Sequence, residues 1–333
     1  HMAVDLITVG RVTMDLLAQD IGAPFEEVTG FATSVGGSPT NIAIGAARLG
    51  LASIAFTGVG DDRVGDYVLR YLGDERVSTE HVVRVPGKHT SLALVAIQPP
   101  DRFPLTFYRD DPADIHVGVE DAAALPIDDT RAILLSGNAF SRGSCADAAR
   151  ICGERARDAG ATTYMDLDLR PTEWPDARAY GQTLRPVLGL VDVLIGTEEE
   201  CHAALAPDPE AVVAGEPLSA DDHAALDERL DALVGAGGVG TVVIKRGPRG
   251  ATVITPAGRT NVRGFSVEAV NTVGAGDAFA AGLIRSRLLG WDWFEAARFG
   301  NACGALQVTR HGCSAVFPTE AEVTALIDEQ GGL

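Results

Sequence analysis

The sequence predicts an α/β fold: a mostly parallel sheet covered by helices on both faces, with a second, smaller β-sheet. Buried-strand runs alternate with helical stretches along most of the chain, a pattern typical of parallel sheets. Two segments, approximately 11–35 and 82–115, break this alternation; the first is irregular and the second contains short strands without helices. We expect one domain over 3–333, in which the two insertions form a small β-sheet lid over the site.

The elements are expected in a simple order along the chain. The apolar run Val4–Val9 predicts the first strand, which ends at Gly10. A helix is expected over 42–50, because Gly50 is a typical helix stop, and the turn 60–65 opens another helix. Further strands are expected at 53–59, 82–85, 90–97, 105–109, 132–135, 162–166, 191–195 and 241–245.

Composition and charge exclude several classes of partner. The 333 residues are enough for a large, well-buried core, and the net charge of −19 would repel nucleic acid and acidic membrane surfaces. No apolar run approaches about 18 residues and no signal peptide precedes the first strand, so we expect a cytoplasmic protein. The five cysteines form no C-x-x-C pair, which favours reduced, packing cysteines over a zinc site.

The stretch 270–282 contains the strongest functional pattern. Gly274, Ala275 and Gly276 form a turn without bulky side chains, and Asp277 follows at the start of an Ala-rich run that we expect to be helical. Backbone N–H groups of such a turn, together with the positive end of a helix dipole, bind anions such as phosphate. Asp277 is therefore either a helix cap or a base placed beside a bound anion.

This stretch resembles the C-terminal signature D-T-x-G-A-G-D of the ribokinase-like (PfkB) sugar kinases. The resemblance implies a ribokinase-like three-layer α/β/α fold, an anion hole at Gly274, Ala275 and Gly276, and Asp277 as the catalytic base. One position departs from the pattern. Asn271 stands where many members carry Asp, near a monovalent-cation site in some relatives, so activation by potassium (K⁺) is left open.

A second pattern, Gly36-Gly37-x-x-x-Asn41, precedes the first predicted helix. By itself it describes a Gly-Gly turn with an Asn cap, which is common. It also resembles the family's N-terminal signature, whose Gly and Asn bind sugar hydroxyls. The same resemblance assigns another hydroxyl to Asp15, and a hydroxyl-rich ligand would explain a buried carboxylate there.

The family resemblance also implies a site for ATP and Mg²⁺. The turn that begins at Lys245 and Gly247 would lie along the nucleotide, and Asn301 would line the adenine side, although each also fits an ordinary turn or helix surface. Glu200 would organise Mg²⁺ through water, or would simply begin a solvated helix; Thr197 replaces the family's Asn. Phosphoryl transfer from ATP requires Mg²⁺ to neutralise the phosphate oxygens.

The substrate prediction rests on two short stretches. Tyr108 and Arg109 end a predicted lid strand, and Asp168 and Arg170 follow a predicted sheet strand. The planar guanidinium suits a carboxylate, although each Arg alone also fits a surface ion pair. Together with 307–313, these stretches resemble the 5-dehydro-2-deoxygluconokinases of inositol breakdown and, less closely, 2-keto-3-deoxygluconate kinases.

We therefore expect an ATP-dependent kinase that phosphorylates a primary hydroxyl of a sugar acid. A ribose, fructose or nucleoside kinase is the alternative within the family, and it would need neutral or stacking contacts instead of two Arg. A non-catalytic metabolite sensor is the alternative outside enzymes, but a sensor has no use for a base at Asp277. The exposed edges of the lid strands make a homodimer through the lid a plausible arrangement.

Overall fold

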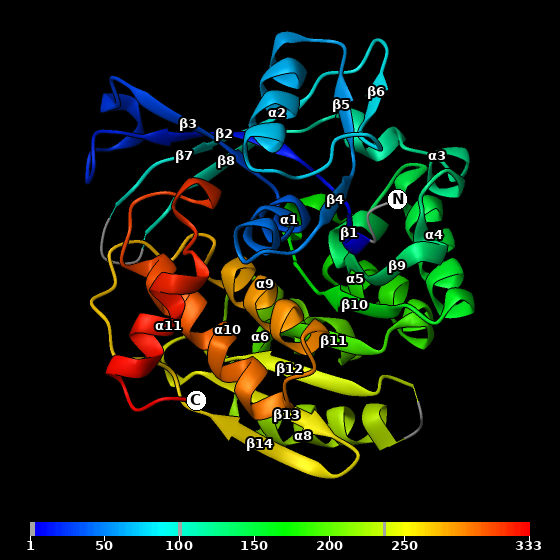
Figure 1. Ribbon diagram of the computed structural model, residues 1–333, viewed down its shortest axis with the longest axis vertical. Helices are drawn as coiled ribbons and strands as arrows, with labels where there is room; N and C mark the ends of the chain where they lie inside the picture. Colours follow the sequence, from blue (N-terminus) through cyan, green and yellow to red (C-terminus); the bar gives the residue numbers. More distant parts are fainter. Residues whose placement is uncertain (1–3, 99–101, 236–237) are drawn as a thin grey trace.

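A central eight-stranded sheet organises the computed structural model, which describes residues 4–98, 102–235 and 238–333 (Figure 1). The strand order is β14-β13-β12-β11-β10-β9-β1-β4. The strands are β1 (Val4–Val9), β4 (Ser53–Phe56), β9 (Thr130–Ser136), β10 (Thr162–Asp166), β11 (Val193–Thr197), β12 (Thr241–Lys245), β13 (Ala251–Thr255) and β14 (Gly258–Val262). The strands from β12 to β4 pair in parallel, and β13 and β14 complete one edge in antiparallel pairing.

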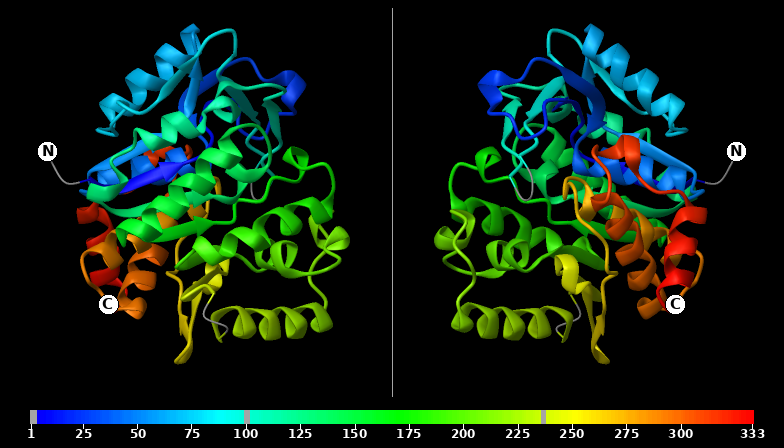
Figure 2. Two further views of the ribbon diagram at one scale, coloured as in Figure 1. Left: turned by 90° about the vertical axis from the view of Figure 1, so that its right-hand side faces the viewer. Right: turned by 90° about the vertical axis from the view of Figure 1, so that its left-hand side faces the viewer.

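Helices cover both faces of this sheet, which confirms the predicted three-layer α/β fold (Figure 2). One face packs against α1 (Ser38–Arg48), α9 (Ala275–Leu288), α10 (Trp293–Val308) and α11 (Glu320–Glu329). The other packs against α3 (Val119–Ala123), α4 (Cys145–Ala159), α5 (Ala177–Leu184), α6 (Glu198–Leu205) and α8 (Ala220–Gly235). The remaining helices are α2 (Arg63–Asp74) and α7 (Glu210–Val213).

The alternation of side chains along the strands explains why these strands read as continuous apolar runs. In β9, Ile133 and Leu135 belong to the core on one face of the sheet, whereas Ala132 and Leu134 belong to the core on the other. Successive residues of a strand point to opposite faces, so a strand covered on both sides is apolar along most of its length. The predicted strands were located from apolar runs of this kind.

A separate four-stranded sheet, β3-β2-β7-β8, lies beside the central sheet (Figure 1). Its strands are β2 (Thr13–Ala18), β3 (Phe31–Gly36), β7 (Ser91–Val95) and β8 (Leu105–Tyr108). All four come from the two predicted insertions. One part of the lid prediction differs, because the strand expected at 82–85 lies outside this sheet. It forms β6 (Val83–Val85), which pairs with β5 (Gly58–Gly60) in a separate two-stranded sheet. The strand expected at 53–59 divides into β4 and β5.

Two observations concern membrane and metal. Within 4–98, 102–235 and 238–333, no helix is both long enough and apolar enough to cross a bilayer. In the same ranges, no three His, Cys, Asp or Glu side chains are grouped so that they could hold a metal ion. All five cysteines are buried free thiols.

Helices α9 and α10 approach so closely at Gly282 that a side chain would not fit. A Cβ added at Gly282 would lie 2.6 Å from Cys303 Sγ and 3.1 Å from Gly300 Cα. We therefore expect Gly282→Val to lower the free energy of unfolding by about 1–3 kcal/mol, measured by urea denaturation. Gly73→Ala in α2 is the control, because nothing lies within 4 Å of its Cβ position and the change should be neutral or stabilising. Equal effects of the two substitutions would contradict the close approach.

Candidate active site

Asp277 lies where the first turns of two helices meet. Helix α9 begins after Gly274, whose φ of 79° lies in the left-handed region that favours glycine. The Asp277 carboxylate accepts hydrogen bonds from Ser38 Oγ at 2.7 Å and from Asn41 Nδ2 at 2.8 Å, both in α1. Gly274 is the N-cap residue and has no side chain to cap the helix, and the bonds of Asp277 run to another helix. The geometry therefore favours a base over a cap.

Burial and hydrogen bonding shift the pKa of Asp277 in opposite directions. Burial raises the pKa of Asp277 above its ordinary value, and the hydrogen bonds from Ser38 and Asn41 act in the opposite direction. A raised pKa makes the carboxylate a better proton acceptor, while the two donors hold its orientation. The group is thus suited to take a proton from an alcohol that approaches it.

The turn before Asp277 has the features of an anion site. The first N–H groups of an α-helix have no partner within the helix. Here Ala275 N donates to Thr272 O at 3.3 Å, so the N–H groups of Gly276 and Asp277 are the ones that face the turn. A Cβ added at Gly274 would lie 3.1 Å from Cys313 Sγ, so the loop passes this point without a side chain. A Cβ at Gly276 would lie 3.3 Å from Lys245 Nζ, which places an ammonium group beside the same turn. Dipole and charge together favour a phosphate here.

Lys245 ends β12 and is held by carboxylates. Its Nζ donates to both carboxylate oxygens of Asp166, at 3.0 and 3.2 Å, and lies 3.9 Å from Glu200 Oε2. Burial alone would lower the pKa of Lys245, but Asp166 and Glu200 together raise it above its usual value. The side chain therefore remains a cation at the carboxyl edge of the sheet, where ligands of parallel sheets bind.

The residues predicted to bind the nucleotide line one mostly apolar cavity of about 240 Å³. Lys245, Gly247, Gly276 and Asn301 border it together with apolar side chains that include Phe265, Val267, Ala269, Phe279, Ala305 and Val308. The Asn301 amide donates to the backbone carbonyls of 262 and 263, both at 3.1 Å, so its nitrogen holds the loop that forms the cavity wall. An apolar slot that opens beside an anion site suits a nucleotide, whose base is flat and whose phosphates are charged.

A smaller cavity of about 110 Å³ lies between the four-stranded sheet and Asp277. Asp15, Gly37, Asn41 and Arg170, four of the residues predicted to bind sugar, line it, and we call it the sugar-side cavity for that reason. Gly36 does not line the cavity, but a Cβ there would lie 2.0 Å from Asp15 Oδ2, so a glycine leaves room for this carboxylate. Asp15 accepts from Thr13 Oγ1 at 2.5 Å, and burial raises its pKa to about 7. The strands β7 and β8 contribute apolar side chains to the same cavity.

Asp168 organises two arginines and does not face the cavity itself. Arg11 binds it with both terminal nitrogens, Ser136 Oγ donates to it at 2.9 Å, and Arg170 Nη2 lies 3.2 Å away. Burial pushes the pKa of Asp168 up, but Arg11 and Arg170 lower it below its ordinary value. Its carboxylate is thus occupied by protein partners. We conclude that Asp168 orients Arg11 and Arg170, both of which line the cavity, and is not available to a sugar.

The substrate predictions for Tyr108 and Arg109 are not supported by the geometry. Leu105 and Phe107 line the cavity, and Tyr108, one residue on, is 62% exposed on the opposite face of β8, as strand alternation requires. Arg109 is 5% exposed and is bound to Asp114 at 2.6 Å, so it is already neutralised inside the protein. Neither residue borders the cavity that contains Asp277.

Glu200, the residue predicted to organise Mg²⁺, forms a helix capping box. Its Oε2 accepts from Thr197 N at 2.8 Å, while Thr197 Oγ1 accepts from Glu200 N at 3.2 Å. Its Oε1 accepts from Leu169 N at 3.2 Å. Each carboxylate oxygen keeps one further acceptor position, which suffices for contact through water near Lys245. The arrangement fits an indirect role toward Mg²⁺, and that role stays a prediction.

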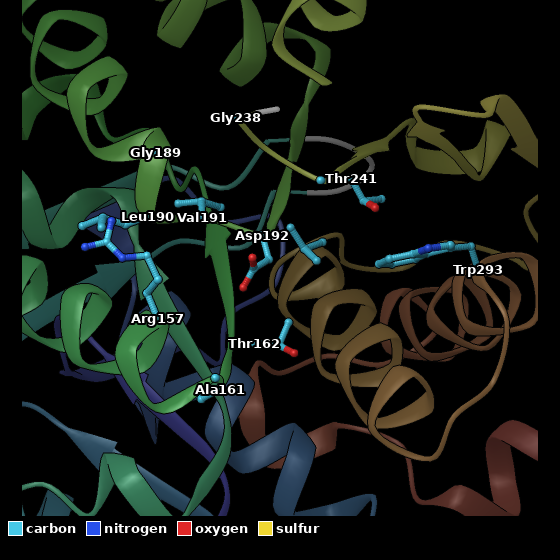
Figure 3. A pocket seen from close by; sticks show the side chains of 13 residues that line it. Arg157, Ala161, Thr162, Gly189, Leu190, Val191, Asp192, Gly238, Thr241 and Trp293 are labelled. Carbon is cyan, nitrogen blue, oxygen red and sulfur yellow. The ribbon is translucent and has the colours of Figure 1, made fainter. Parts of the chain in front are cut away.

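A further cavity of about 480 Å³ lies at the opposite, amino edge of β10, β11 and β12 (Figure 3). Arg157, Asp192 and Trp293 border it, together with glycines of the connecting turns. The Asp192 carboxylate accepts a hydrogen bond from the backbone N–H of Thr163 and so stabilises the start of β10. The residues that could transfer a phosphoryl group lie at the other edge.

Sequence reasoning missed several residues of the sugar-side cavity. Arg11 follows Gly10 at the carboxyl end of β1, and that position is the one sequence signal that could have identified it. Ser38 stands between the Gly-Gly turn and Asn41, and Cys313 Sγ lies 3.3 Å from Asn41 Nδ2. Nothing local in the sequence pointed to the contacts of Ser38 and Cys313, because their partners lie more than 200 residues away.

The whole chain resembles known kinases. Residues 4–320 match the model described as "pfkB family carbohydrate kinase". The "5-dehydro-2-deoxygluconokinase 1" of Bacillus cereus is 32% identical over 97% of this chain and 95% of that protein. The "5-dehydro-2-deoxygluconokinase" of Geobacillus thermodenitrificans is 33% identical over 97% and 93%.

Solved structures share the fold of this chain. The "Fructokinase with bound ATP" of Xylella fastidiosa superimposes with a TM-score of 0.82, at 26% identity and with 99% of each chain covered. The match over nearly the full length agrees with the sequence matches and with the three-layer architecture. The chain therefore belongs to the PfkB family of carbohydrate kinases.

Proposed function

We propose that this kinase uses ATP to phosphorylate a primary hydroxyl of a sugar acid, and that the preferred sugar is 5-dehydro-2-deoxy-D-gluconate. The observation that carries the proposal is Arg170, whose guanidinium lines the cavity that also contains Asp277. Two relatives, each 32–33% identical, are named 5-dehydro-2-deoxygluconokinase, which supports the same substrate.

The charge around Arg170 supports an anionic substrate. Arg170 donates from Nη1 to its neighbour's carbonyl, Leu169 O, at 2.9 Å and contacts Asp168 through Nη2, yet 38% of its side chain stays exposed. Asp168 is shared with Arg11, so one carboxylate serves two guanidinium groups. In a protein of net charge −19, such a local cation is needed to hold a carboxylate. A neutral sugar could accept a hydrogen bond from this guanidinium but would lack the charge-assisted part of the interaction.

Asp277 is the proposed general base. It would take the proton of the hydroxyl while Ser38 and Asn41 keep its carboxylate in place. The N–H groups after Gly274, together with Lys245, would hold the transferring phosphoryl group, and Mg²⁺ bound with ATP supplies charge neutralisation of the phosphate oxygens. The four-stranded sheet borders the cavity and would exclude water when it closes over the sugar.

Asp277→Asn should lower kcat by about 10²–10⁴-fold and leave ATP binding near normal, because the amide is isosteric but accepts no proton. Single-turnover kinetics and calorimetric titration with ATP measure the two effects. Ser38→Ala is the matched control: it removes one of the bonds that orient Asp277 but keeps the base, so its loss should be clearly smaller. A variant Asp277→Asn that retained half of the wild-type kcat would exclude the base mechanism.

The fall of kcat/KM at low pH should reflect the protonation of Asp277. Its pKa is raised, so kcat/KM should fall as the pH drops through that raised pKa, earlier than for an ordinary Asp. Asp15, with a pKa of about 7, adds a second ionisation to the profile. Asp15→Asn should remove that second ionisation and leave the Asp277 limb, measured as kcat/KM from pH 4 to 9. A wild-type profile that is flat down to pH 4 would contradict the raised pKa of Asp277.

Arg170→Ala should lower kcat/KM for the sugar acid by about ten- to a hundredfold, the equivalent of one charge-assisted hydrogen bond. The loss should be small for the reduced, uncharged counterpart of the same sugar, which serves as the control. Equal losses on both compounds would show that Arg170 supports the structure or the nucleotide instead of the carboxylate.

A phosphorylation screen with ATP tests the substrate class directly. 5-Dehydro-2-deoxygluconate should give the highest kcat/KM, with 2-keto-3-deoxygluconate second, because both present a carboxylate and a primary hydroxyl. Faster turnover of ribose, fructose or a nucleoside than of any sugar acid would overturn the substrate proposal and leave the kinase assignment intact.

A further inference from the structure

Three backbone carbonyl oxygens converge on one buried amide group beside the anion site. Gln307, in the last turn of α10, is 0% exposed. Its Nε2 donates to Val273 O at 3.1 Å, to Gly312 O at 3.1 Å and to Cys313 O at 3.3 Å. A carbonyl oxygen can only accept, so the group that faces all three must be the amide nitrogen and not the amide oxygen.

Such a group of oxygens has the form of a cation site. Proteins bind potassium with backbone carbonyl oxygens that point at one centre and replace the ion's water. Here the –NH₂ group of Gln307 stands at that centre and satisfies the carbonyls by hydrogen bonding. A cation could reach these oxygens only after displacing the amide.

The charge of the surrounding loop also disfavours a cation. Asn271 is fully buried, and its Oδ1 accepts from Val273 N at 2.9 Å, so this residue offers no free carboxylate. The backbone N–H groups of Val270 and Asn271 both donate to Val308 O, at 2.7 and 3.1 Å. A potassium ion, which the family resemblance left open, therefore does not fit the groups present: the three carbonyls are occupied, and Asn271 brings no charge to compensate an ion.

The carbonyls that Gln307 holds belong to the two loops that shape the site. Val273 immediately precedes Gly274, where the anion turn begins. Cys313 lines the sugar-side cavity, and its Sγ accepts from Asn41, which in turn binds Asp277. Gln307 thus ties the start of α9 to the loop that follows α10, next to both the phosphate and the base.

We infer that Gln307 is a positioning residue that does in this enzyme what a bound monovalent cation would do: it holds the anion turn in its working geometry. The enzyme accordingly needs no monovalent cation for turnover. The inference concerns the geometry of phosphoryl transfer and is independent of which sugar is used.

The experiment compares wild type with two Gln307 variants, each assayed in potassium chloride and in tetramethylammonium chloride at equal ionic strength. Wild type should turn over equally in both salts, because its carbonyls are already satisfied. Gln307→Ala removes the amide and leaves room, so kcat should fall about 10- to 100-fold in tetramethylammonium and recover in part with potassium. Gln307→Met fills the same space without a donor; its loss should be similar and should not respond to potassium.

Thermal denaturation without substrate gives a readout that does not depend on activity. Potassium should raise the Tm of Gln307→Ala, because an ion that binds only the folded state stabilises it, and should leave the Tm of wild type and of Gln307→Met unchanged. Tetramethylammonium is too large for the vacated space and should have no effect. The thermal denaturation curve would also show whether Gln307→Ala is unfolded at the assay temperature. In that case the kcat of Gln307→Met would be compared with that of wild type instead.

Three results would overturn the inference. The first is a several-fold rise in wild-type kcat with potassium. The second is a Gln307→Met variant that is folded and as active as wild type in tetramethylammonium. The third is a Tm of Gln307→Ala that does not respond to potassium although the variant is folded. A wrong sugar assignment would change none of these outcomes, because the salts are compared on whichever sugar the enzyme phosphorylates.

Discussion

The hydrogen bonds from Ser38 and Asn41 to Asp277 join the first turns of α1 and α9, and the rest of the site depends on this junction. The two helices can meet only because small residues face each other along them: a Cβ added at Gly45 would lie 2.8 Å from Ala281 Cβ. Helix packing thus sets the position of the base relative to the residues that precede α1. Those same residues form the wall of the sugar-side cavity, so substrate and base are located by one interface.

Charge is distributed in the site as compensated pairs that leave selected cations accessible. Lys245 is balanced by Asp166, and Arg11 is balanced by Asp168. Removing either carboxylate would strand a buried cation, which costs more than the pair contributes to stability. Arg170 shares Asp168 with Arg11 and keeps part of its side chain open to the cavity. A strongly acidic protein can in this way present positive charge to anionic ligands at one edge of its sheet.

The sequence was informative wherever function depends on local pattern. Strand and helix alternation predicted the layers, which the structure confirms, because alternation is a property of consecutive residues. The turn 274–277 indicated an anion site beside a carboxylate for the same reason, and that site stays a prediction. Contacts between distant residues were not predictable in the same way. Arg109 was expected to bind substrate, but Asp114 neutralises it inside the fold, and Tyr108 lies on the outer face of its strand. Arg11 was missed because its partner is 157 residues away.

An amide and a cation can hold the same carbonyl oxygens, but they differ in the charge they bring to the phosphate. The amide of Gln307 orients Val273 and the anion turn without adding any net charge. Positive charge near that turn must then come from a side chain, and Lys245 Nζ lies 3.3 Å from the Cβ position of Gly276. The carboxylates of Asp166 and Glu200 outweigh the effect of burial and raise the pKa of Lys245, so its charge persists through the neutral range. Geometry and charge, which one bound ion would supply together, are in this chain the work of two separate residues.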